Sequence, residues 1–468
     1  MTQIKFQEGQ AELPTPESTH SYWHHDPSPE LLGHRTTDKL PDHADVVVVG
    51  SGITGTFAAR ELVEGGRNVL MLEAREACWG ATGRNGGHCH PMVFTSKPNI
   101  AQFELDNYFF MRDFVSANKV PCDWQSVGAV CRLATEEEAQ TAKDNVRLLR
   151  RHHPSLADKA IYVEDAQQLK ELRVPDARAA VVHPHAAKVW PYKLVAWVLE
   201  MLLRKNDSTK KPTRFNLQTT TPVTHLQRHG ASWVLHTPRG QVVAKQVLLA
   251  TNGYTSHLLP RMTGLIRPTR GQVSALLPPK GYTPLAHTHI WGTAAGGEDY
   301  LVQRDGGSGV LILGGERSGD AAARSRTSRD DVTDPDISAR LRTASYNVLE
   351  LRPGQEGGEA EKLQATYEWT GIMGYSRDGH PWVGEVPEGL GGGKGLYISA
   401  GYTGHGMPAA SRSGVAAANM ILGKGTGDVK LPPEFVISEE RASQAEKTVL
   451  PSSLEDEIRM NAFWIQQQ

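Results

Sequence analysis

The sequence predicts an α/β protein whose main domain is built on a doubly wound parallel sheet. Residues 45–49 read Asp-Val-Val-Val-Val, a continuous apolar run typical of a strand that is buried on both faces. Residues 53–64 repeat their apolar side chains at helical spacing, and Gly65-Gly66 ends that helix. A second apolar run follows from Val69 to Leu72. Strand, helix and strand together make a βαβ unit of about 30 residues.

Further along the chain, apolar spacing predicts three helices, at residues 98–118, 135–153 and 191–204. Strands are expected at residues 221–228, 232–237, 242–250, 363–369 and 395–400, and residues 270–317 look mainly β. A helix of small residues is predicted from about 406 to 422. Residues 1–41 have no sustained periodicity, so we expect an extension that wraps the body as a partly ordered arm.

Length and charge exclude several classes of protein. The 468 residues allow two or three domains at about 150 residues each. Lys plus Arg (50) nearly equals Asp plus Glu (52), so the chain lacks the basic excess of a nucleic-acid-binding protein. Four cysteines without a Cys-x-x-Cys pair favour reduced thiols over a zinc site. The chain shows no signal-peptide pattern and no run of 18 apolar residues, so we expect a cytoplasmic protein without a membrane span.

The turn after the first strand matches a dinucleotide-binding fingerprint. Gly50 permits the tight turn, Gly52 lets the backbone approach a pyrophosphate, and Gly55 lets the helix pack closely on the strand. The helix N-terminus can receive the phosphates. Glu73 ends the second strand, where its carboxylate can accept both ribose hydroxyls and would repel a 2′-phosphate. This pattern predicts a bound dinucleotide but does not separate NAD from FAD.

Two further glycine-rich segments favour FAD. Residues 80–88, Gly-Ala-Thr-Gly-Arg-Asn-Gly-Gly-His, follow shortly after the acid that would bind the ribose. An NAD domain has no need of such a segment there, whereas FAD extends past the pyrophosphate through its ribityl chain and isoalloxazine ring. Residues 401–407, Gly-Tyr-Thr-Gly-His-Gly-Met, precede a predicted helix whose N-terminus can face the N1/C2=O edge of the flavin.

On these motifs, the sequence resembles the D-amino-acid-oxidase/glycine-oxidase superfamily of FAD enzymes over roughly residues 42 to 430. The segments GATGRNGGH and WTGIMGYSRDGHPWVG are most similar to its γ-glutamylputrescine-oxidase-like branch. The resemblance implies an FAD-binding Rossmann-like domain with an inserted α+β substrate domain on a mixed or antiparallel sheet. It divides the chain as follows: extension 1–41, FAD domain 42–98, 183–257 and 369–424, substrate domain mostly 99–182 and 258–368, C-terminal tail 425–468.

The resemblance also implies which residues hold the cofactor, from the pyrophosphate and adenosine to the flavin ring. They are Gly50, Ser51, Gly52, Ile53, Thr54, Gly55, Glu73, Ala74, Arg75, Gly80, Ala81, Thr82, Arg84, Asn85, Gly86, Gly87, His88, Val223, Thr251, Asn252, Gly253, Gly374, Gly404, His405, Gly406 and Met407. Arg84 would neutralise a phosphate or a flavin carbonyl. Non-covalent FAD is favoured, and His88 and Cys89 are the conceivable sites of covalent attachment.

Candidate substrate residues follow from the same resemblance. His405 is expected to give a hydrogen bond or a positive field at the flavin rather than to act as a base. Trp369 and Tyr375 flank the segment that crosses the family's substrate cavity, where aromatic rings could cage an amine. Arg270 would either reach the pocket or pin the domain junction. His183-x-His185 should place both rings on one strand face, but two ligands do not make a site, so no metal is predicted.

The implied function is oxidation of a C–N bond of an amine by hydride transfer to flavin N5, followed by hydrolysis of the imine. Electrons would pass to O2 or a carrier, because no second GxGxxG motif is visible. In amino-acid and glycine oxidases an arginine clamps the substrate carboxylate shortly before an Asp-Gly-x-Pro segment. Counting back from Asp378 puts Met373 at that position, so amines without an α-carboxylate should be the better substrates. The alternatives are a biosynthetic flavin dehydrogenase or oxidase on a larger secondary-metabolite amine and a non-catalytic flavoprotein, and no oligomeric state is predicted.

Overall fold

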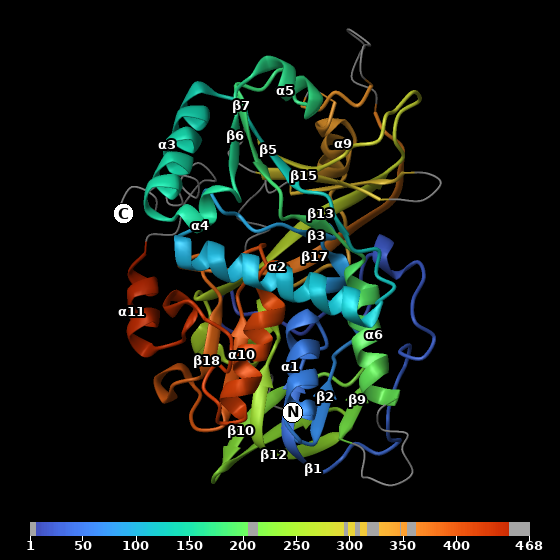
Figure 1. Ribbon diagram of the computed structural model, residues 1–468. Helices are drawn as coiled ribbons and strands as arrows, with labels where there is room; N and C mark the ends of the chain where they lie inside the picture. The colour runs from blue at the N-terminus through green and yellow to red at the C-terminus, as the bar shows by residue number, and fades with distance from the viewer. Residues whose placement is uncertain are drawn as a thin grey trace.

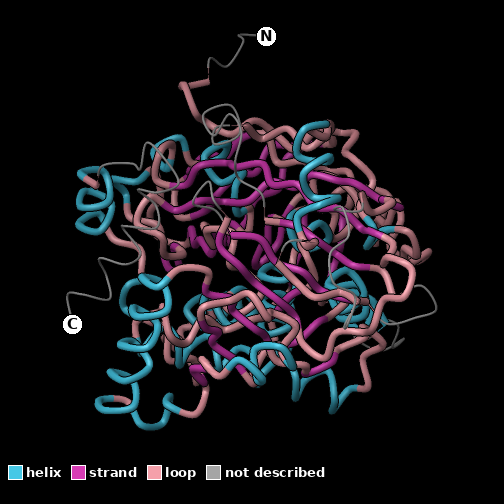
Figure 2. Tube along the Cα trace, turned by 90° about the horizontal axis from the view of Figure 1, so that it is seen from above, coloured by secondary structure: helices cyan, strands magenta, loops and turns pink. Residues whose placement is uncertain are grey.

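The computed structural model describes residues 6–204, 214–293, 298–304, 309–315, 327–346, 348–352 and 362–448. Two eight-stranded sheets build the molecule, one in its lower half and one in its upper half in Figure 1. The long helix α2 (Pro98–Asn118) crosses between them. Seen from above in Figure 2, the strands run through the middle and the helices lie mostly toward the edges.

The first sheet has the order β10-β11-β12-β1-β2-β9, and β19 and β18 extend it beside β12. Its strands are β1 (His43–Val49), β2 (Val69–Leu72), β9 (Phe215–Gln218), β10 (His225–His229), β11 (Ser232–Thr237), β12 (Gly240–Leu249), β18 (Trp382–Glu385) and β19 (Leu396–Ala400). The pairs β1–β12, β1–β2, β2–β9 and β12–β19 are parallel. The predicted parallel sheet and its opening βαβ unit are therefore confirmed.

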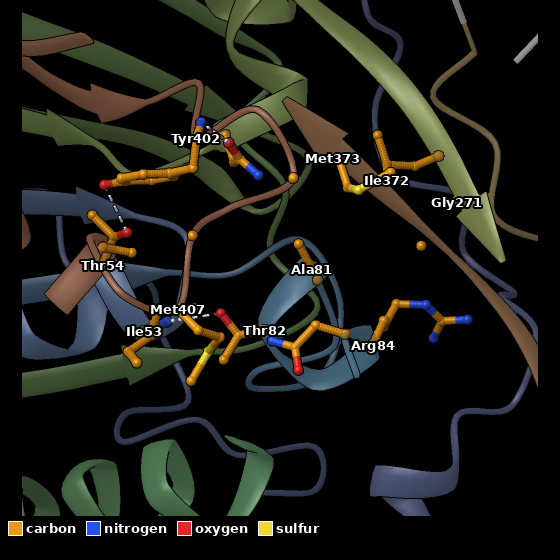
Figure 3. Close-up of a pocket in the computed structure, with 18 of the residues that line it drawn as sticks. Ile53, Thr54, Ala81, Thr82, Arg84, Gly271, Ile372, Met373, Tyr402 and Met407 are labelled. Atoms are coloured by element: carbon orange, nitrogen blue, oxygen red, sulfur yellow. Dashed lines mark hydrogen bonds between the residues drawn. The ribbon is translucent and has the colours of Figure 1, made fainter. Parts of the chain in front are cut away.

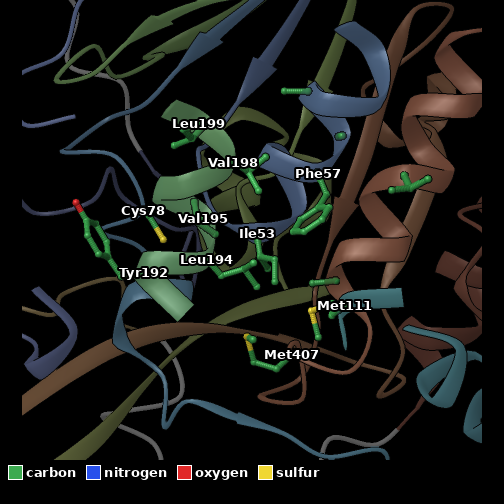
Figure 4. Packing of buried hydrophobic residues seen from close by; sticks show 14 of the residues in the cluster. Ile53, Phe57, Cys78, Met111, Tyr192, Leu194, Val195, Val198, Leu199 and Met407 are labelled. Atoms are coloured by element: carbon green, nitrogen blue, oxygen red, sulfur yellow. The ribbon is translucent and has the colours of Figure 1, made fainter. Parts of the chain in front are cut away.

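Three helices cover one face of this sheet: α1 (Ile53–Glu64), α6 (Pro191–Arg204) and α10 (Ala410–Ile421). Their buried side chains meet in one apolar cluster, in which Phe57 of α1 lies near Val198 of α6 (Figure 4). The helices α1 and α10 approach closely because Gly414 has no side chain, and a Cβ there would lie 2.3 Å from Thr54 O. This packing holds the N-terminal end of α1 at the sheet edge where the glycine-rich segments meet.

The second sheet has the order β17-β13-β16-β15-β14-β5-β7-β6. Its strands are β5 (Ala129–Leu133), β6 (Ile161–Val163), β7 (Ala179–His183), β13 (Ile266–Leu276), β14 (Thr288–Gly292), β15 (Glu298–Gln303), β16 (Leu311–Gly314) and β17 (Ala365–Ser376). Only β5 and β14 pair in parallel, so the sheet is mixed, as predicted.

Short helices and a third, small sheet complete the described part of the chain. The helices are α3 (Glu136–His152), α4 (Pro154–Ala157), α5 (Ala166–Glu171), α7 (Thr255–Leu258), α9 (Pro335–Ala344) and α11 (Glu439–Lys447). The small sheet pairs β8 (Ala187–Lys188) with β3 (His88–Cys89) and β4 (Gln125–Ser126). No helix among the described residues is long and apolar enough to cross a membrane.

One predicted boundary needs correction. The boundary at residue 369 divides one strand, because β17 pairs with β13 from Ala365 to Ser376 and belongs to the second sheet throughout. The predicted tail at 425–468 packs on the body as far as residue 448, where Arg441 Nε of α11 lies 2.7 Å from Asp378 Oδ2. Residues 449–468 lie outside the described part of the chain. The predicted arm, described from residue 6, is ordered and fully buries Trp23.

Candidate functional site

A cavity of about 310 Å³ lies where the two sheets meet, and walls from both sheets line it. The first sheet contributes the β1–α1 turn, the strand-end turn at Ala250–Asn252 and the loop Gly404–Met407. The second sheet contributes Gly371–Met373 of β17 and Gly271 of β13. Figure 3 shows Ile53, Thr82 and Met407 on one side of this space and Ile372 and Met373 on the other. The motifs that are far apart in sequence thus surround one cavity.

The β1–α1 turn forms a cradle in which each glycine is required by its surroundings. Gly50 has a φ of +102°, and a Cβ there would lie 2.7 Å from Ala250 O. A Cβ at Gly55 would lie 2.0 Å from Gly50 O, so only glycine lets α1 start this close to β1. Gly52 lines the cavity, and its Cβ position is 3.1 Å from Thr82 Oγ1. These are the roles that the fingerprint assigns to the three glycines.

Glu73 stands at the end of β2 with its carboxylate oriented by its neighbours. Oε2 accepts hydrogen bonds from Ser51 N (3.0 Å) and Ser51 Oγ (2.6 Å), and Oε1 accepts one from Arg75 N (2.9 Å). Glu73 also lines the cavity. A carboxylate has about four acceptor positions, so one position is left for a ribose hydroxyl.

The guanidinium of Arg84 does not point where a phosphate partner would be expected. Arg84 lines the cavity, but its side chain extends away from Thr82 and the α1 N-terminus (Figure 3). Nε donates to Thr370 O (2.6 Å), the other nitrogens donate to Ser18 Oγ (3.1 Å) and to Thr19, and Asp330 lies 3.5 Å from Nε. Burial lowers the pKa of Arg84 to about 10. The guanidinium therefore holds the N-terminal arm instead of facing a phosphate.

The loop that precedes α10 forms the opposite end of the cavity. Asn252 Oδ1 accepts hydrogen bonds from Gly401 N (3.0 Å) and Tyr402 N (3.4 Å), which ties the strand-end turn to this loop. His405 Nε2 lies 3.2 Å from Glu104 Oε1 of α2, a partner that the sequence did not predict. Glu104 is buried, and this contact places the His405 ring beside the cavity.

Most of the predicted cofactor residues line the cavity. Five are not part of the lining: Ser51, Gly55, Gly87, Gly253 and Gly374. The last two lie back to back, because a Cβ at Gly374 would approach Gly253 N to 2.8 Å. The missing side chains therefore allow β17 to pack against the strand-end turn.

Three of the four predicted catalytic residues are not brought to the cavity. Trp369 is fully buried, and its indole Nε1 donates to Arg84 O at 2.7 Å. Tyr375 is 5% exposed and lies in the core, and Arg270 on β13 is not part of the lining. The reason is that β17 presents only Gly371–Met373 to the cavity. The aromatic cage of Trp369 and Tyr375 is thus wrong, and His405 is the predicted catalytic residue that lines the cavity.

Several lining residues escaped the sequence analysis because they come from the second sheet or from the segment after β3, where no motif marks them. They are His90, Met92, Ile290, Glu298 and Tyr300. The Tyr300 ring explains a glycine of the RNGG segment, since a Cβ at Gly86 would lie 2.0 Å from it. Burial lowers the pKa of His88 to about 3 and the pKa of His90 well below its usual value, so both imidazoles are neutral.

The expectation that His183 and His185 share a strand face is wrong, because β7 ends at His183. His183 Nδ1 instead lies 2.9 Å from His90 Nε2, and Cys131 Sγ is 3.7 Å from the same nitrogen. Burial lowers the pKa of His183 to about 3. A hydrogen bond between two neutral imidazoles accounts for the short nitrogen–nitrogen distance.

Neither conceivable tether is poised to attach a flavin. Nε2 of His88 lies 2.8 Å from Thr288 Oγ1 and is occupied by that hydrogen bond. The Cys89 thiol is directed at Met407 O, 3.8 Å away, and burial raises its pKa, which disfavours the reactive thiolate. Acid precipitation of the purified protein is therefore expected to release its flavin into the supernatant. Absorbance of the supernatant and of the redissolved pellet is the measurement, and flavin retained by the pellet would redirect attention to His88.

The residues present fit a bound FAD. Gly52 leaves room that a side chain would fill, the N-terminus of α1 meets the cavity, and the lining continues from Glu73 to Met407. The fold and the site thus define a dinucleotide-binding flavoprotein.

Comparisons with known proteins agree with this class. A family model described as FAD dependent oxidoreductase (DAO) matches residues 45–420. Probable oxidoreductase OrdL of Rhizobium meliloti is 24% identical over 406 residues, which cover 82% of this chain and 84% of OrdL. Gamma-glutamylputrescine oxidoreductase of Escherichia coli is 23% identical over 406 residues, 81% of this chain and 84% of that protein. The structure of glycine oxidase from Geobacillus kaustophilus has a TM-score of 0.67 at 19% identity, covering 85% of this chain and 99% of that structure.

The chain belongs to the DAO family of FAD-dependent oxidoreductases. The resemblance that the motifs indicated, the fold and FAD as the cofactor are confirmed.

Proposed function

We propose that this enzyme oxidises the C–N bond of a primary or secondary amine that carries no carboxylate beside the reacting carbon. When FAD is bound, its isoalloxazine ring accepts the hydride lost by the amine-bearing carbon, and water hydrolyses the resulting imine. The relative from E. coli is named for such a substrate, γ-glutamylputrescine, whereas glycine oxidase is named for an amino acid. The charges that line the cavity favour an amine without an α-carboxylate over an amino acid.

One observation carries this proposal: no described cation in the cavity lining is free to hold a substrate carboxylate. The lining cations among the described residues are Arg75 and Arg84. Arg75 NH1 donates to both oxygens of Asp330 at 3.0 Å, and the donors of Arg84 are used by the arm and by Thr370. A bidentate arginine contact is hard to replace, so an α-carboxylate would enter the cavity without a partner.

The register of β17 supports the same conclusion. Met373, at the position that sequence counting gives for a clamping arginine, lines the cavity, and its thioether cannot pair with a carboxylate. The nearby Arg377 donates to Thr448 O at 3.1 and 3.3 Å, on the side of α11.

The remaining lining residues suit an amine. Glu298 and Tyr300 of β15 offer a carboxylate and an aromatic ring, both of which attract cations, so a second amino group on the substrate has a partner. His88 and His90 are neutral and add no positive charge that would repel it. His405, beside Glu104, places its imidazole at the flavin end of the cavity, where a ring N–H can donate a hydrogen bond.

We further propose that the electrons pass to O2 or to a carrier, because the sequence has no second dinucleotide fingerprint. The cytoplasm is the location that we propose, and the four free, buried thiols support it.

The experiment compares flavin reduction by matched pairs, each pair consisting of an amine and its α-carboxylated analogue. Under anaerobic conditions the amine is expected to bleach the flavin at least about 10-fold faster than its α-carboxylated analogue. The carboxylate of the analogue gives up a charge-assisted hydrogen bond with water and finds no partner in the cavity, which costs about this factor. Met373→Arg should narrow or invert this ratio, whereas the matched control Met373→Leu should not.

Each other outcome identifies a different error. Faster reduction by the amino acids in most pairs would show that another arginine holds the carboxylate. Arg270 would then be the first residue to replace. No bleaching by any amine would favour a non-catalytic flavoprotein. Bleaching only by bulky amines would favour the biosynthetic alternative. Reoxidation by air separates an oxidase, which reoxidises quickly, from a dehydrogenase.

A further inference from the structure

The N-terminal arm, defined here as residues 10–24, precedes the segment that matches the family model, which begins at residue 45. It nevertheless reaches the cofactor cavity, where Leu13 and Pro14 form part of the lining. They are half-buried, and Tyr254 and His257 from the strand-end turn and α7 line the same cavity. The arm therefore contributes apolar surface to a site that is otherwise built by the segment matching the family model.

The first anchor of the arm lies beside this apolar surface. Ala11 is fully buried, and its N–H donates to Ser256 Oγ at 2.9 Å. Gln10 Nε2 donates to Ser256 O at 3.0 Å. Because Ser256 is the neighbour of the lining residue His257, this anchor positions the arm directly against the cavity wall.

The second anchor is the buried carboxylate of Asp330, which the arm shares with the cavity. Thr15 Oγ1 donates to Asp330 Oδ1 at 2.7 Å, and Thr19 N donates to Asp330 O at 2.9 Å. The same carboxylate accepts a hydrogen bond from Arg75 NH1 at 3.0 Å and lies 3.5 Å from Arg84 Nε. Two lining arginines and the arm are thus connected through one charged group with no solvent exposure.

The third anchor lies behind the RNGG segment. Trp23 is fully buried, donates from Nε1 to Asn85 O at 2.5 Å, and accepts at its carbonyl a hydrogen bond of 2.9 Å from Trp190 Nε1. Its ring occupies the space beside Gly87, where a Cβ would lie 2.6 Å away. Asn85 itself lines the cavity. The arm is therefore attached to cavity-forming residues along its whole length.

We propose that the arm is part of the FAD site: it closes the end of the cavity that Tyr254 and His257 line, and it determines how slowly the cofactor is released. Leu13 and Pro14 give the cofactor an apolar contact, while the three anchors hold that contact in place. By linkage, a segment that retains FAD must itself be retained by FAD, so cofactor and arm stabilise each other. The proposal rests on the cofactor of the family and is independent of the substrate proposed above.

Proteolysis tests this reciprocity on the full chain. Glu12 and Glu17 are exposed in the arm and are the sites for a glutamate-specific protease. Cleavage there is expected to be at least about 10-fold slower in the FAD-loaded protein than in the FAD-stripped protein, and FAD added back should restore protection. Cleavage at Glu136 and Glu137 of α3 serves as the control for global unfolding. Equal rates at Glu12 and Glu17 with and without FAD would overturn the proposal.

Point variants test retention in the other direction, because deletion of the whole arm would remove Trp23 from the core. Ser256→Ala removes the hydrogen bond of Ala11 N from the first anchor and is expected to release FAD at least about 5-fold faster, measured by the fluorescence of free flavin after dilution. Asp26→Asn is the matched control: it breaks the exposed pair with Lys193 (2.6 Å) just beyond the arm and should leave the rate unchanged. Release from Ser256→Ala no faster than from Asp26→Asn would contradict the role of the arm.

Discussion

Gly52→Val is expected to yield a folded protein that contains no FAD. Gly52 has an ordinary φ of −66°, so valine causes no backbone strain. Its Cβ would stand 3.1 Å from Thr82 Oγ1, the group that accepts the hydrogen bond of Ile53 N, and its methyl groups would fill the adjoining cavity. The pyrophosphate of FAD needs this space and the N–H groups of the helix N-terminus. We expect the FAD content to fall at least about 100-fold, since several charge-assisted hydrogen bonds are lost together.

The ratio of flavin to protein absorbance measures the FAD content, and circular dichroism shows that the variant is folded. Gly52→Ala, with a single methyl group, should retain an intermediate amount. Glu64→Ala, at the exposed C-terminal end of the same helix, should bind FAD normally and so controls for damage to α1. A full complement of FAD in Gly52→Val would mean that the pyrophosphate lies elsewhere.

Acidification from pH 7 to pH 5 is expected to lower the free energy of unfolding by several kcal/mol. Burial lowers the pKa of His24, His88 and His183 to about 3 and that of His289 to about 4. In the unfolded chain these groups titrate near 6.5, so between the two values the unfolded state binds more protons and stability falls as the pH falls. Each histidine costs about 2 kcal/mol at pH 5, or about 8 kcal/mol together, against about 5–15 kcal/mol for a typical domain.

Denaturant titrations at pH 7, 6 and 5 measure how steeply the free energy of unfolding falls with pH. His289 Nε2–H donates to Leu172 O (3.0 Å), a contact that an amide N–H can keep, so His289→Gln should lose less stability on acidification than the natural chain. His153→Gln alters an exposed ring and should leave the slope unchanged. A free energy of unfolding that is constant from pH 7 to pH 5 would mean that these imidazoles are not held neutral.

Local sequence patterns were enough to predict the helices and turns whose conformation depends mainly on neighbouring residues. The helices 98–118 and 191–204 match α2 and α6 at both ends, because apolar spacing, a proline at the first position and the chain's own polar boundaries specify them. The roles of Gly50, Gly52 and Gly55 could also be predicted, since a turn of this type constrains its glycines whatever surrounds it.

Only the tertiary structure decided which side chains face the cavity. Met92 follows β3 and is far in sequence from β14 and β15, whose pairing brings Ile290 next to Tyr300; all of them line the same cavity. Tertiary packing also explains why Trp369 does not line the cavity. Because β17 packs on the RNGG segment, the Trp369 indole donates a hydrogen bond to Arg84 O.

The role of Arg84 shows the physical reason most clearly. Its position between glycines predicts a cation next to a phosphate, and the backbone does stand at the cavity. The direction of its guanidinium, however, is set by Asp330, Thr370 and Thr19, which lie hundreds of residues away or in the arm. A buried charge goes where its hydrogen bonds can be satisfied, and those partners exist only after both sheets and the arm have come together.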